Sequence, residues 1–247
     1  MSRMPRLLGR SGFMHIYSRG VNKQDIFLKK TDYNYFLEKL SALSEEMGFE
    51  ILAYCLMPNH YHLVLFDENA RYSTIIKRLS TSYVMHFNNK YSRVGPLFQG
   101  RFCGKPIEDD IYLMTVIKYV HMNPQKAGIC KMQEYKWSSY QEYVLGRKIC
   151  NTDKVINLFG GIVEFMKMHN TEDIATHAEL ENEKPSDEEA VKIICSILKD
   201  DNPTSLVNYS RQKRDMFITE IKKMGIQNQQ LARVTGLSMY VIRHVRK

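Results

Sequence analysis

The chain has 247 residues, a formal net charge of +8 and a hydrophobic fraction of 44%, which allow one medium-sized globular domain and a smaller one. No apolar run approaches the roughly 18 residues that a membrane-spanning helix needs, so a membrane protein is not expected. The basic N-terminal stretch lacks the apolar core of a secretory signal, and the five scattered cysteines suit a reducing cytoplasm.

The first part of the chain alternates strand-like and helix-like patterns. Strands are expected where apolar and polar residues alternate, and helices where apolar residues recur every three or four positions. In chain order, the patterns predict a strand at 12–21, a helix at 30–47, a strand-like run at 49–66 broken at Pro58-Asn59, a helix at 74–90, a glycine-rich loop or strand at 95–107 and a helix from 108 to Asn123. This order, without a repeated βαβ unit, indicates an α+β fold with a mostly antiparallel sheet.

Charge separates the rest of the chain from this first part. Residues 1–150 carry 21 Lys and Arg against 13 Asp and Glu, residues 151–200 carry 5 against 11, and residues 201–247 carry 9 against 3. The acidic, polar segment 151–189 is predicted to be a linker between a domain at 1–150 and a small helical domain at 190–247. Two basic blocks suit a polyanionic partner such as nucleic acid, although solvated lysine-rich surfaces give the same pattern.

The last twenty residues have the spacing of a helix-turn-helix. Gly236 permits the turn, and Ser238 is a candidate N-cap for the second helix. That helix carries Arg243 and Arg246, which we expect to contact DNA. A small all-α bundle used for packing or dimerisation is the alternative.

Two histidines, His60 and His62, lie one residue apart inside an otherwise apolar run. In a strand, side chains at this spacing point to the same face. Two neutral imidazoles so placed can share one divalent metal ion. The alternative is a pair of core histidines that are hydrogen-bonded to the backbone.

The helix that precedes Pro124 offers further groups. Asn123 follows Tyr119 by four residues, so both can project from one helical face. An amide oxygen suits a hard cation such as Mg²⁺ or Mn²⁺, and a tyrosine hydroxyl can attack a phosphorus and hold it covalently. Spacing alone does not separate Tyr119 from Tyr112, and Asn-Pro is also an ordinary helix stop.

Five stretches, in this order, carry a family resemblance over about residues 11–145. They are HIYSRGVNKQDIF (15–27), LMPNHYHLVL (56–65), GPLFQGRF (95–102), YLMTVIKYVHMNPQKAG (112–128) and YKWSSYQEY (135–143). Together they resemble the HUH single-tyrosine transposases, and within them the branch of REP-associated tyrosine transposases.

This resemblance implies a ferredoxin-like antiparallel sheet with helices on one face, in a domain that cuts and rejoins single-stranded DNA. On the family's pattern, His60 and His62 hold the metal, Mg²⁺ or Mn²⁺, and Tyr119 is the nucleophile. Asn123 stands where the family completes the metal site, a position at which related branches use glutamine. Tyr61 replaces the bulky hydrophobe that the family has between its histidines. The implied intermediate is a 5′-phosphotyrosine, formed as a 3′-hydroxyl leaves.

The resemblance also suggests partners and leaves two other functions open. Arg19, Arg101 and Lys105 lie in the matching stretches and are candidates for phosphate contacts, although ordinary surface charges explain them equally well. The expected substrate is single-stranded DNA with a hairpin or repeat, and a homodimer is one expected assembly. The alternatives are a repeat-DNA-binding regulator derived from a transposase, and a replication-initiator or relaxase-like nickase.

Overall fold

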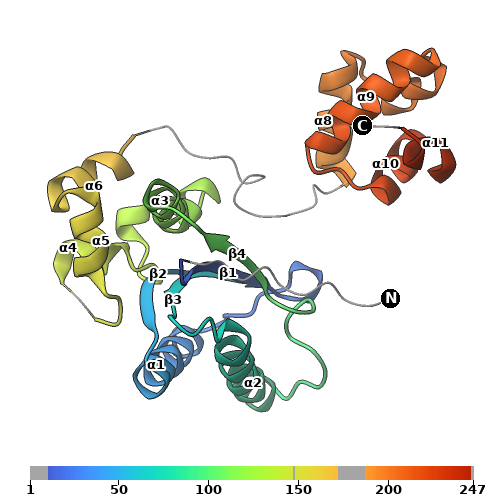
Figure 1. Ribbon diagram of the computed structural model, residues 1–247. Coiled ribbons are helices and arrows are strands. Elements are labelled where there is room, and N and C mark those ends of the chain that lie inside the picture. The colour runs from blue at the N-terminus through green and yellow to red at the C-terminus, as the bar shows by residue number, and fades with distance from the viewer. Residues whose placement is uncertain (1–10, 147, 172–186, 246–247) are drawn as a thin grey trace. The chain divides into compact units, whose positions relative to one another are not determined.

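The computed structural model describes residues 11–146, 148–171 and 187–245, and the chain forms two compact units, residues 1–174 and 175–247 (Figure 1). The first unit contains β1 (Phe13–Arg19), α1 (Lys30–Met47), β2 (Glu50–Met57), β3 (His60–Phe66), α2 (Tyr72–Lys90), β4 (Cys103–Ile107), α3 (Asp110–Lys126), α4 (Tyr140–Leu145), α5 (Thr152–Phe159) and α6 (Ile162–His169). The second contains α8 (Asp187–Leu198), α9 (Arg211–Lys223), α10 (Asn228–Thr235) and α11 (Met239–Arg243). Short 3₁₀ turns lie at Val21–Lys23, Met132–Glu134 and Pro203–Asn208.

The four strands form one sheet in the order β2-β3-β1-β4, and every neighbouring pair is antiparallel. The chain runs β1-α1-β2 and then β3-α2-β4, so each helix follows one strand and precedes the next. Two such β-α-β units interleaved in one antiparallel sheet are the ferredoxin-like arrangement. The predicted α+β class and ferredoxin-like sheet are therefore confirmed.

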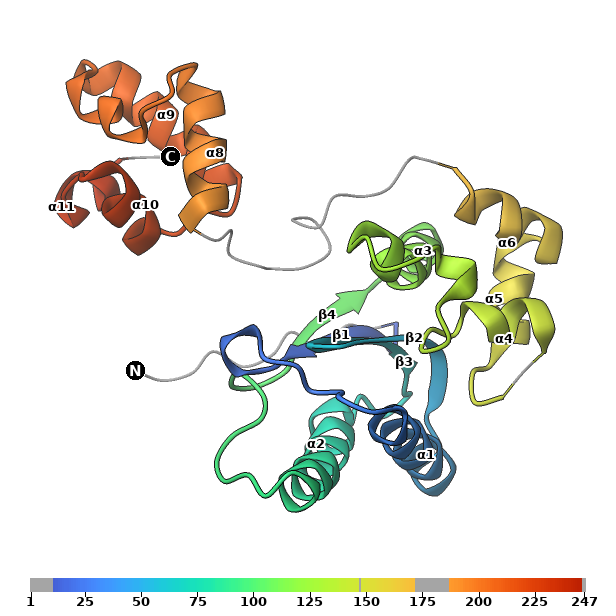
Figure 2. The ribbon, with the colours of Figure 1, turned by 180° about the vertical axis from the view of Figure 1, so that it is seen from behind.

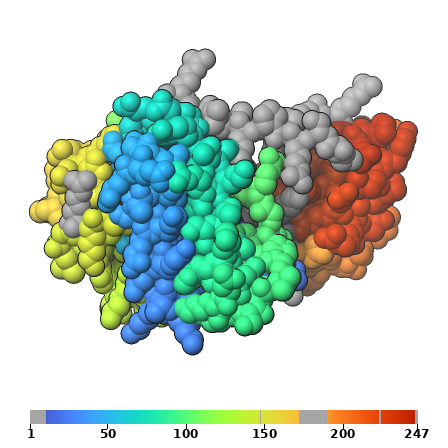
Figure 3. Space-filling view, turned by 90° about the horizontal axis from the view of Figure 1, so that it is seen from below, coloured from blue at the N-terminus to red at the C-terminus, as the bar shows by residue number. Residues whose placement is uncertain are grey.

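Helices α1 and α2 lie side by side over one face of this sheet (Figures 1 and 3). Their apolar residues recur at helical spacing and meet alternate residues of the strands. Buried side chains of this core include Phe36, Leu40 and Leu43 of α1, Ile75, Ile76 and Leu79 of α2, and Tyr61, Leu63 and Leu65 of β3. Because side chains alternate along a strand, His60 and His62 point away from this core.

Helix α3 lies over the opposite face of the sheet (Figures 1 and 2). Helices thus cover both faces, whereas the resemblance implied helices on one face; α1 and α2 keep to one side as expected, and α3 is the addition. Every residue from 116 to 124 is buried, because α3 contacts β2 and β3 and also α5 and α6.

The predicted end of α3 at Asn123 is three residues too early, since the helix continues to Lys126. Pro124 lacks the backbone N–H that would otherwise donate a helical hydrogen bond to the carbonyl of Val120. The side-chain amide of Asn123 donates to that carbonyl at 3.5 Å and to the carbonyl of Tyr119 at 2.9 Å. The side-chain amide of Asn123 therefore replaces the hydrogen bond that Pro124 cannot donate to Val120, and the helix continues past the proline.

Ordered helices occupy part of the segment 151–189 that was expected to be a linker. Helices α5 and α6 fold against α3 in the first unit, and α8 begins at Asp187. The remainder of that segment, 172–186, lies outside the described residues. Short amphipathic helices carry many polar residues, which is why composition alone suggested a linker.

The second unit is the expected small all-α domain. Its core is formed by apolar side chains from all four helices, among them Ile194, Ile218, Leu231 and Ile242. Between α10 and α11, Gly236 adopts a left-handed conformation (φ 75°), and the Ser238 hydroxyl accepts a hydrogen bond from the N–H of Val241. Both features match the predicted helix-turn-helix.

Candidate functional site

The face of the sheet that α3 covers carries titratable side chains from three strands. In the β1–β3 ladder, Tyr17 pairs with His62 and Arg19 pairs with His60. In the β1–β4 ladder, Lys105 pairs with His15. Cross-strand partners share a face, so all six residues lie on the face that carries the two predicted histidines. We call His15, Tyr17, Arg19, His60, His62 and Lys105 the histidine face.

The two predicted histidines are adjacent, and neighbouring groups orient their rings. The ring centroids of His60 and His62 are 5.0 Å apart and the rings are nearly perpendicular, at 89°. His60 Nδ1 lies 2.6 Å from Asn59 Oδ1, and His62 Nδ1 lies 3.1 Å from His15 Nε2. Since Asn59 Oδ1 only accepts, His60 donates from Nδ1, and its lone pair is on Nε2. His62 has the same arrangement when its Nδ1 donates to His15.

Tyr119 extends from α3 against this pair of rings. Its ring centroid is 5.6 Å from that of His62 and 6.0 Å from that of His15, with edge-to-face geometry in both cases. The ammonium of Lys126, two helical turns later, lies 4.6 Å from the centroid of the same ring. Of the two tyrosines of α3, Tyr119 makes the described ring contacts to these histidines, which separates it from Tyr112. Tyr119 is fully buried.

The chemistry of the donor set fits a divalent cation. Orienting a histidine through Nδ1 so that Nε2 can ligate is the usual second-shell arrangement of metal sites. Because the Asn123 Nδ2 amide is used by helix carbonyls, Oδ1 is the atom that Asn123 can offer. Within the described part of the chain, no group of three or more His, Cys, Asp or Glu side chains is placed to hold a metal ion. An amide, water or substrate oxygen is therefore needed to complete a site at the two histidines.

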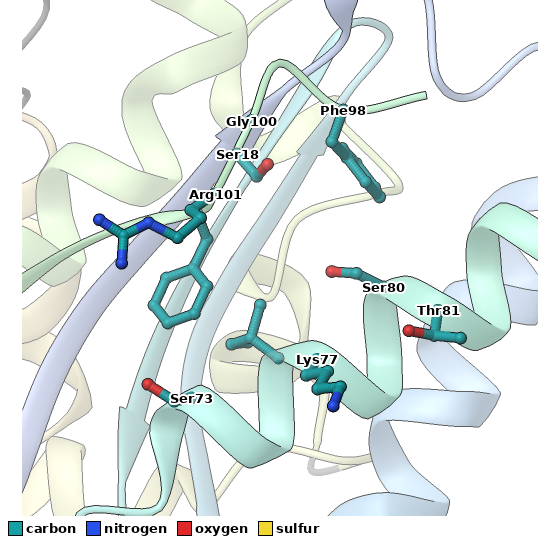
Figure 4. A pocket seen from close by; sticks show the side chains of 10 residues that line it. Ser18, Ser73, Lys77, Ser80, Thr81, Phe98, Gly100 and Arg101 are labelled. Atoms are coloured by element: carbon teal, nitrogen blue, oxygen red, sulfur yellow. The ribbon is translucent and has the colours of Figure 1, made fainter. Parts of the chain in front are cut away.

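The predicted phosphate-contacting residues lie on β1, on β4 and in the loop that leads into β4. Arg19 is half-buried beside His60, and Lys105 is half-buried beside His15. Arg101 is exposed in the loop before β4, next to a pocket of about 410 Å³ that this loop forms with α2. In Figure 4, Ser73, Lys77 and Ser80 of α2 line the pocket, whereas the Arg101 side chain extends away from α2.

The structure describes one of the two arginines predicted at the helix-turn-helix. Arg243, the last residue of α11, is exposed. Arg246 lies outside the described residues. Their predicted contact with DNA remains a prediction.

Comparisons with known proteins agree with this geometry. Residues 12–123 match the family of IS200-like transposases. The chain is 28% identical over 127 residues to a putative REP-associated tyrosine transposase of Haemophilus influenzae, a match that covers 46% of this chain and 72% of that protein. It is also similar to the solved structure of a REP-associated tyrosine transposase bound to a REP hairpin, with a TM-score of 0.47, 20% identity, and coverage of 59% of this chain and 86% of the other.

The segment that holds the sheet, both histidines and Tyr119 matches the IS200-like transposase family, and the resemblance found in the sequence is confirmed. Among the described residues, no helix is long and apolar enough to cross a membrane.

Three residues of the site, His15, Tyr17 and Lys126, were missed from the sequence. His15 lies on the histidine face because β1 pairs with β3, a long-range pairing that no local pattern reports. Lys126 could have been found, because it follows Tyr119 by seven residues and two helical turns return to the same face.

Proposed function

We propose that this protein is a metal-dependent endonuclease and strand transferase for single-stranded DNA, acting through a 5′-phosphotyrosine on Tyr119. The observation that carries the proposal is the contact of the Tyr119 ring with His62, on a face where a second histidine is adjacent. The match of residues 12–123 to the family of IS200-like transposases supports the same chemistry. A phenol beside two imidazoles that can hold a cation places a nucleophile next to a group that can polarise a phosphate.

In the proposed reaction, the Tyr119 oxygen attacks a backbone phosphorus. A P–O(Tyr) bond forms, the bond from phosphorus to the 3′-oxygen breaks, and the phenol proton is balanced by the proton that the leaving 3′-hydroxyl takes up. A 3′-hydroxyl can later attack the phosphotyrosine and reverse these exchanges, which joins strands without a nucleotide cofactor. Because Tyr119 is buried, binding of the strand must first expose its hydroxyl.

His60, His62 and Asn123 would hold the cation, which we propose to be Mg²⁺ or Mn²⁺. When bound, such an ion polarises a phosphate oxygen and stabilises its developing charge. The protein's own residues orient the site. His15 and Asn59 fix the two imidazole rings through Nδ1, and Arg19 and Lys105 place positive charge on the same face for the DNA backbone.

We propose that the substrate is single-stranded DNA with a hairpin or repeat. The support is the REP hairpin held by a similar protein and the net charge of +8. In this proposal Arg101 also contacts the backbone, Arg243 and Arg246 contact DNA through the helix-turn-helix, and a homodimer remains one assembly to test. The five cysteines are thiols and not disulfides, which supports a cytoplasmic location.

The test is incubation of the protein with a hairpin-bearing oligonucleotide and Mg²⁺, followed by denaturing electrophoresis and mass analysis. The expected result is a covalent DNA–protein adduct on the peptide that contains Tyr119. It should disappear in Tyr119→Phe and with a chelator, and persist in the matched control Tyr112→Phe. A wild-type protein that binds the hairpin but never cuts it would contradict the proposal and leave the regulator as the better account.

A further inference from the structure

A second polar cluster lies on the side of α3 that faces α4 and α6. His121 Nδ1 is 3.0 Å from His169 Nε2, and His121 Nε2 is 2.8 Å from the Ser139 hydroxyl. His169 Nδ1 is 2.8 Å from the carbonyl of Phe165. The Ser139 hydroxyl also accepts from the N–H of Tyr54 in β2, at 2.9 Å. Four elements, β2, α4, α3 and α6, are thus joined through the three side chains Ser139, His121 and His169, which we call the polar relay.

When both imidazoles are neutral, the hydrogen bonds of the polar relay have one consistent direction. A carbonyl only accepts, so His169 donates from Nδ1 to Phe165 and its Nε2 accepts. His121 must then donate from Nδ1, and its Nε2 accepts from the Ser139 hydroxyl. That hydroxyl has its remaining acceptor capacity for the N–H of Tyr54. Burial lowers the pKa of both rings, so both are neutral, and each carries its proton on Nδ1. The Ser139 hydroxyl, which also lies 3.2 Å from the Tyr54 carbonyl, gives its one hydrogen to His121.

The three side chains of the polar relay are buried among aromatic rings, so a lost hydrogen bond there is hard to replace. Ser139, His121 and His169 are all buried, with at most 1% of the residue surface exposed. Aromatic rings enclose the two imidazoles: the Phe165 ring centroid is 4.0 Å from that of His169, and the Tyr143 centroid is 5.3 Å from that of His121. In such a setting no water can replace a lost partner, so breaking one hydrogen bond leaves a buried polar atom unsatisfied.

The polar relay sits on the opposite side of α3 from the nucleophile. His121 follows Tyr119 by two residues, which is about 200° around a helix. Lys118, three residues before His121, donates from Nζ to the carbonyl and the hydroxyl of Thr171, just after α6. A rotation of α3 that turned Tyr119 away from His62 would pull both His121 and Lys118 from their partners.

We propose that Ser139, His121 and His169 are positioning residues, which fix the rotation of α3 and so hold Tyr119 against the histidine face. The proposal rests on the proposed function of Tyr119 for its catalytic consequence. The hydrogen-bond pattern itself does not depend on that function. Residues after the matched family segment, including Ser139 and His169, thereby become part of the machinery that sets the nucleophile.

The first test measures the polar relay in the wild-type protein without DNA. In ¹⁵N spectra of the histidine rings at neutral pH, His121 and His169 should each show a protonated Nδ1 and an unprotonated Nε2. Assignment comes from His121→Phe and His169→Leu, each of which removes one set of signals. An Nε2-protonated form at either residue would overturn the directed chain.

The second test measures positioning with Ser139→Ala and His169→Leu. Each variant should form the Tyr119–DNA adduct about 10- to 100-fold more slowly in a single turnover, with hairpin affinity unchanged. The matched control is Tyr54→Phe, which removes the 2.8 Å bond from the Tyr54 hydroxyl to Glu142 but keeps the backbone N–H that donates to Ser139. The control should cleave within twofold of the wild type. Folded variants that cleave at the wild-type rate would overturn the proposal.

A third readout separates this proposal from the proposed function. If the wild type forms no adduct, hydrogen–deuterium exchange still reports on α3. Ser139→Ala and His169→Leu should speed exchange of the amides at 116–123 at least tenfold, whereas the amides of β3 should keep their rates. Unchanged exchange in α3 would overturn the positioning role whatever the outcome of the cleavage assay.

Discussion

The two faces of one sheet differ in kind, and strand β3 supplies both. Its residues Tyr61, Leu63 and Leu65 enter an apolar core with α1 and α2, whereas His60 and His62 point to the face that α3 covers. A shift of register by one residue would exchange the two sets. Alternation along seven residues thus separates what stabilises the fold from what we propose carries out the chemistry.

This separation has a consequence for substitutions. A change on the α1/α2 face should act on the free energy of unfolding, because it removes buried apolar contacts. A change on the histidine face should act on DNA cleavage, because its groups contact the proposed reacting atoms. The predictions below test where this division holds, from the largest expected effect to the smallest.

The largest effect is expected from paired substitutions in β3. Leu63→Ala removes a fully buried side chain and should lower the free energy of unfolding by about 2–5 kcal/mol, with cleavage per folded molecule unchanged. His62→Gln should abolish cleavage and cost less stability, since an amide can still bond to His15. Denaturant titrations and adduct assays on both variants check this. Equal losses of cleavage per folded molecule in the two variants would contradict the division between the two faces of the sheet.

Acid should destabilise the α3 side of the first unit at moderate pH. Burial lowers the pKa of His169 to about 4, and burial followed by the nearby His169 lowers the pKa of His121 well below its usual value. A lowered histidine pKa means that the unfolded chain takes up the proton first. The stabilisation is thus fully present above about pH 6.5 and lost as the pH falls toward 4, by about 3 kcal/mol for His169.

Equilibrium unfolding of the full chain at several pH values between 4 and 7 measures this slope. Replacing the titrating ring in His169→Gln should flatten it, at a lower stability at pH 7. A slope that is the same in wild type and His169→Gln would show that other groups cause the acid sensitivity.

The smallest effect is expected at the surface of the second unit. Arg233 forms a two-pronged ion pair with Asp187, at 2.6 and 2.7 Å, and both side chains are about half exposed or more. Exposed pairs of this kind contribute little, since water and salt screen them. Arg233→Ala should therefore leave the thermal midpoint of the helical unit unchanged within error. A clear drop would mean that this pair orders the start of α8.

Local patterns in the sequence were enough to predict most helices and strands and the central residues of the site. The helix at 30–47 was predicted with its observed bounds, and period-two spacing placed His60 and His62 on one face. The family resemblance selected Tyr119, which spacing alone had left equivalent to Tyr112. These features depend on neighbours within one or two turns, or on motifs that are continuous in the chain.

What could not be predicted depends on pairing between distant segments. His15 joins the site only through the β1–β3 ladder, and His121 meets His169 across 48 residues. The passage of α3 through Pro124 depends on one side-chain amide.

The contrast between the two faces is tested most directly by locating bound Mn²⁺. Anomalous diffraction from crystals of the protein grown with Mn²⁺ should show one strong peak bonded to His60 and His62, on the side of the sheet that α3 covers. The peak should vanish in a variant that combines His60→Gln and His62→Gln. A peak bonded elsewhere, or one that survives in that variant, would contradict a metal-dependent reaction site on the histidine face.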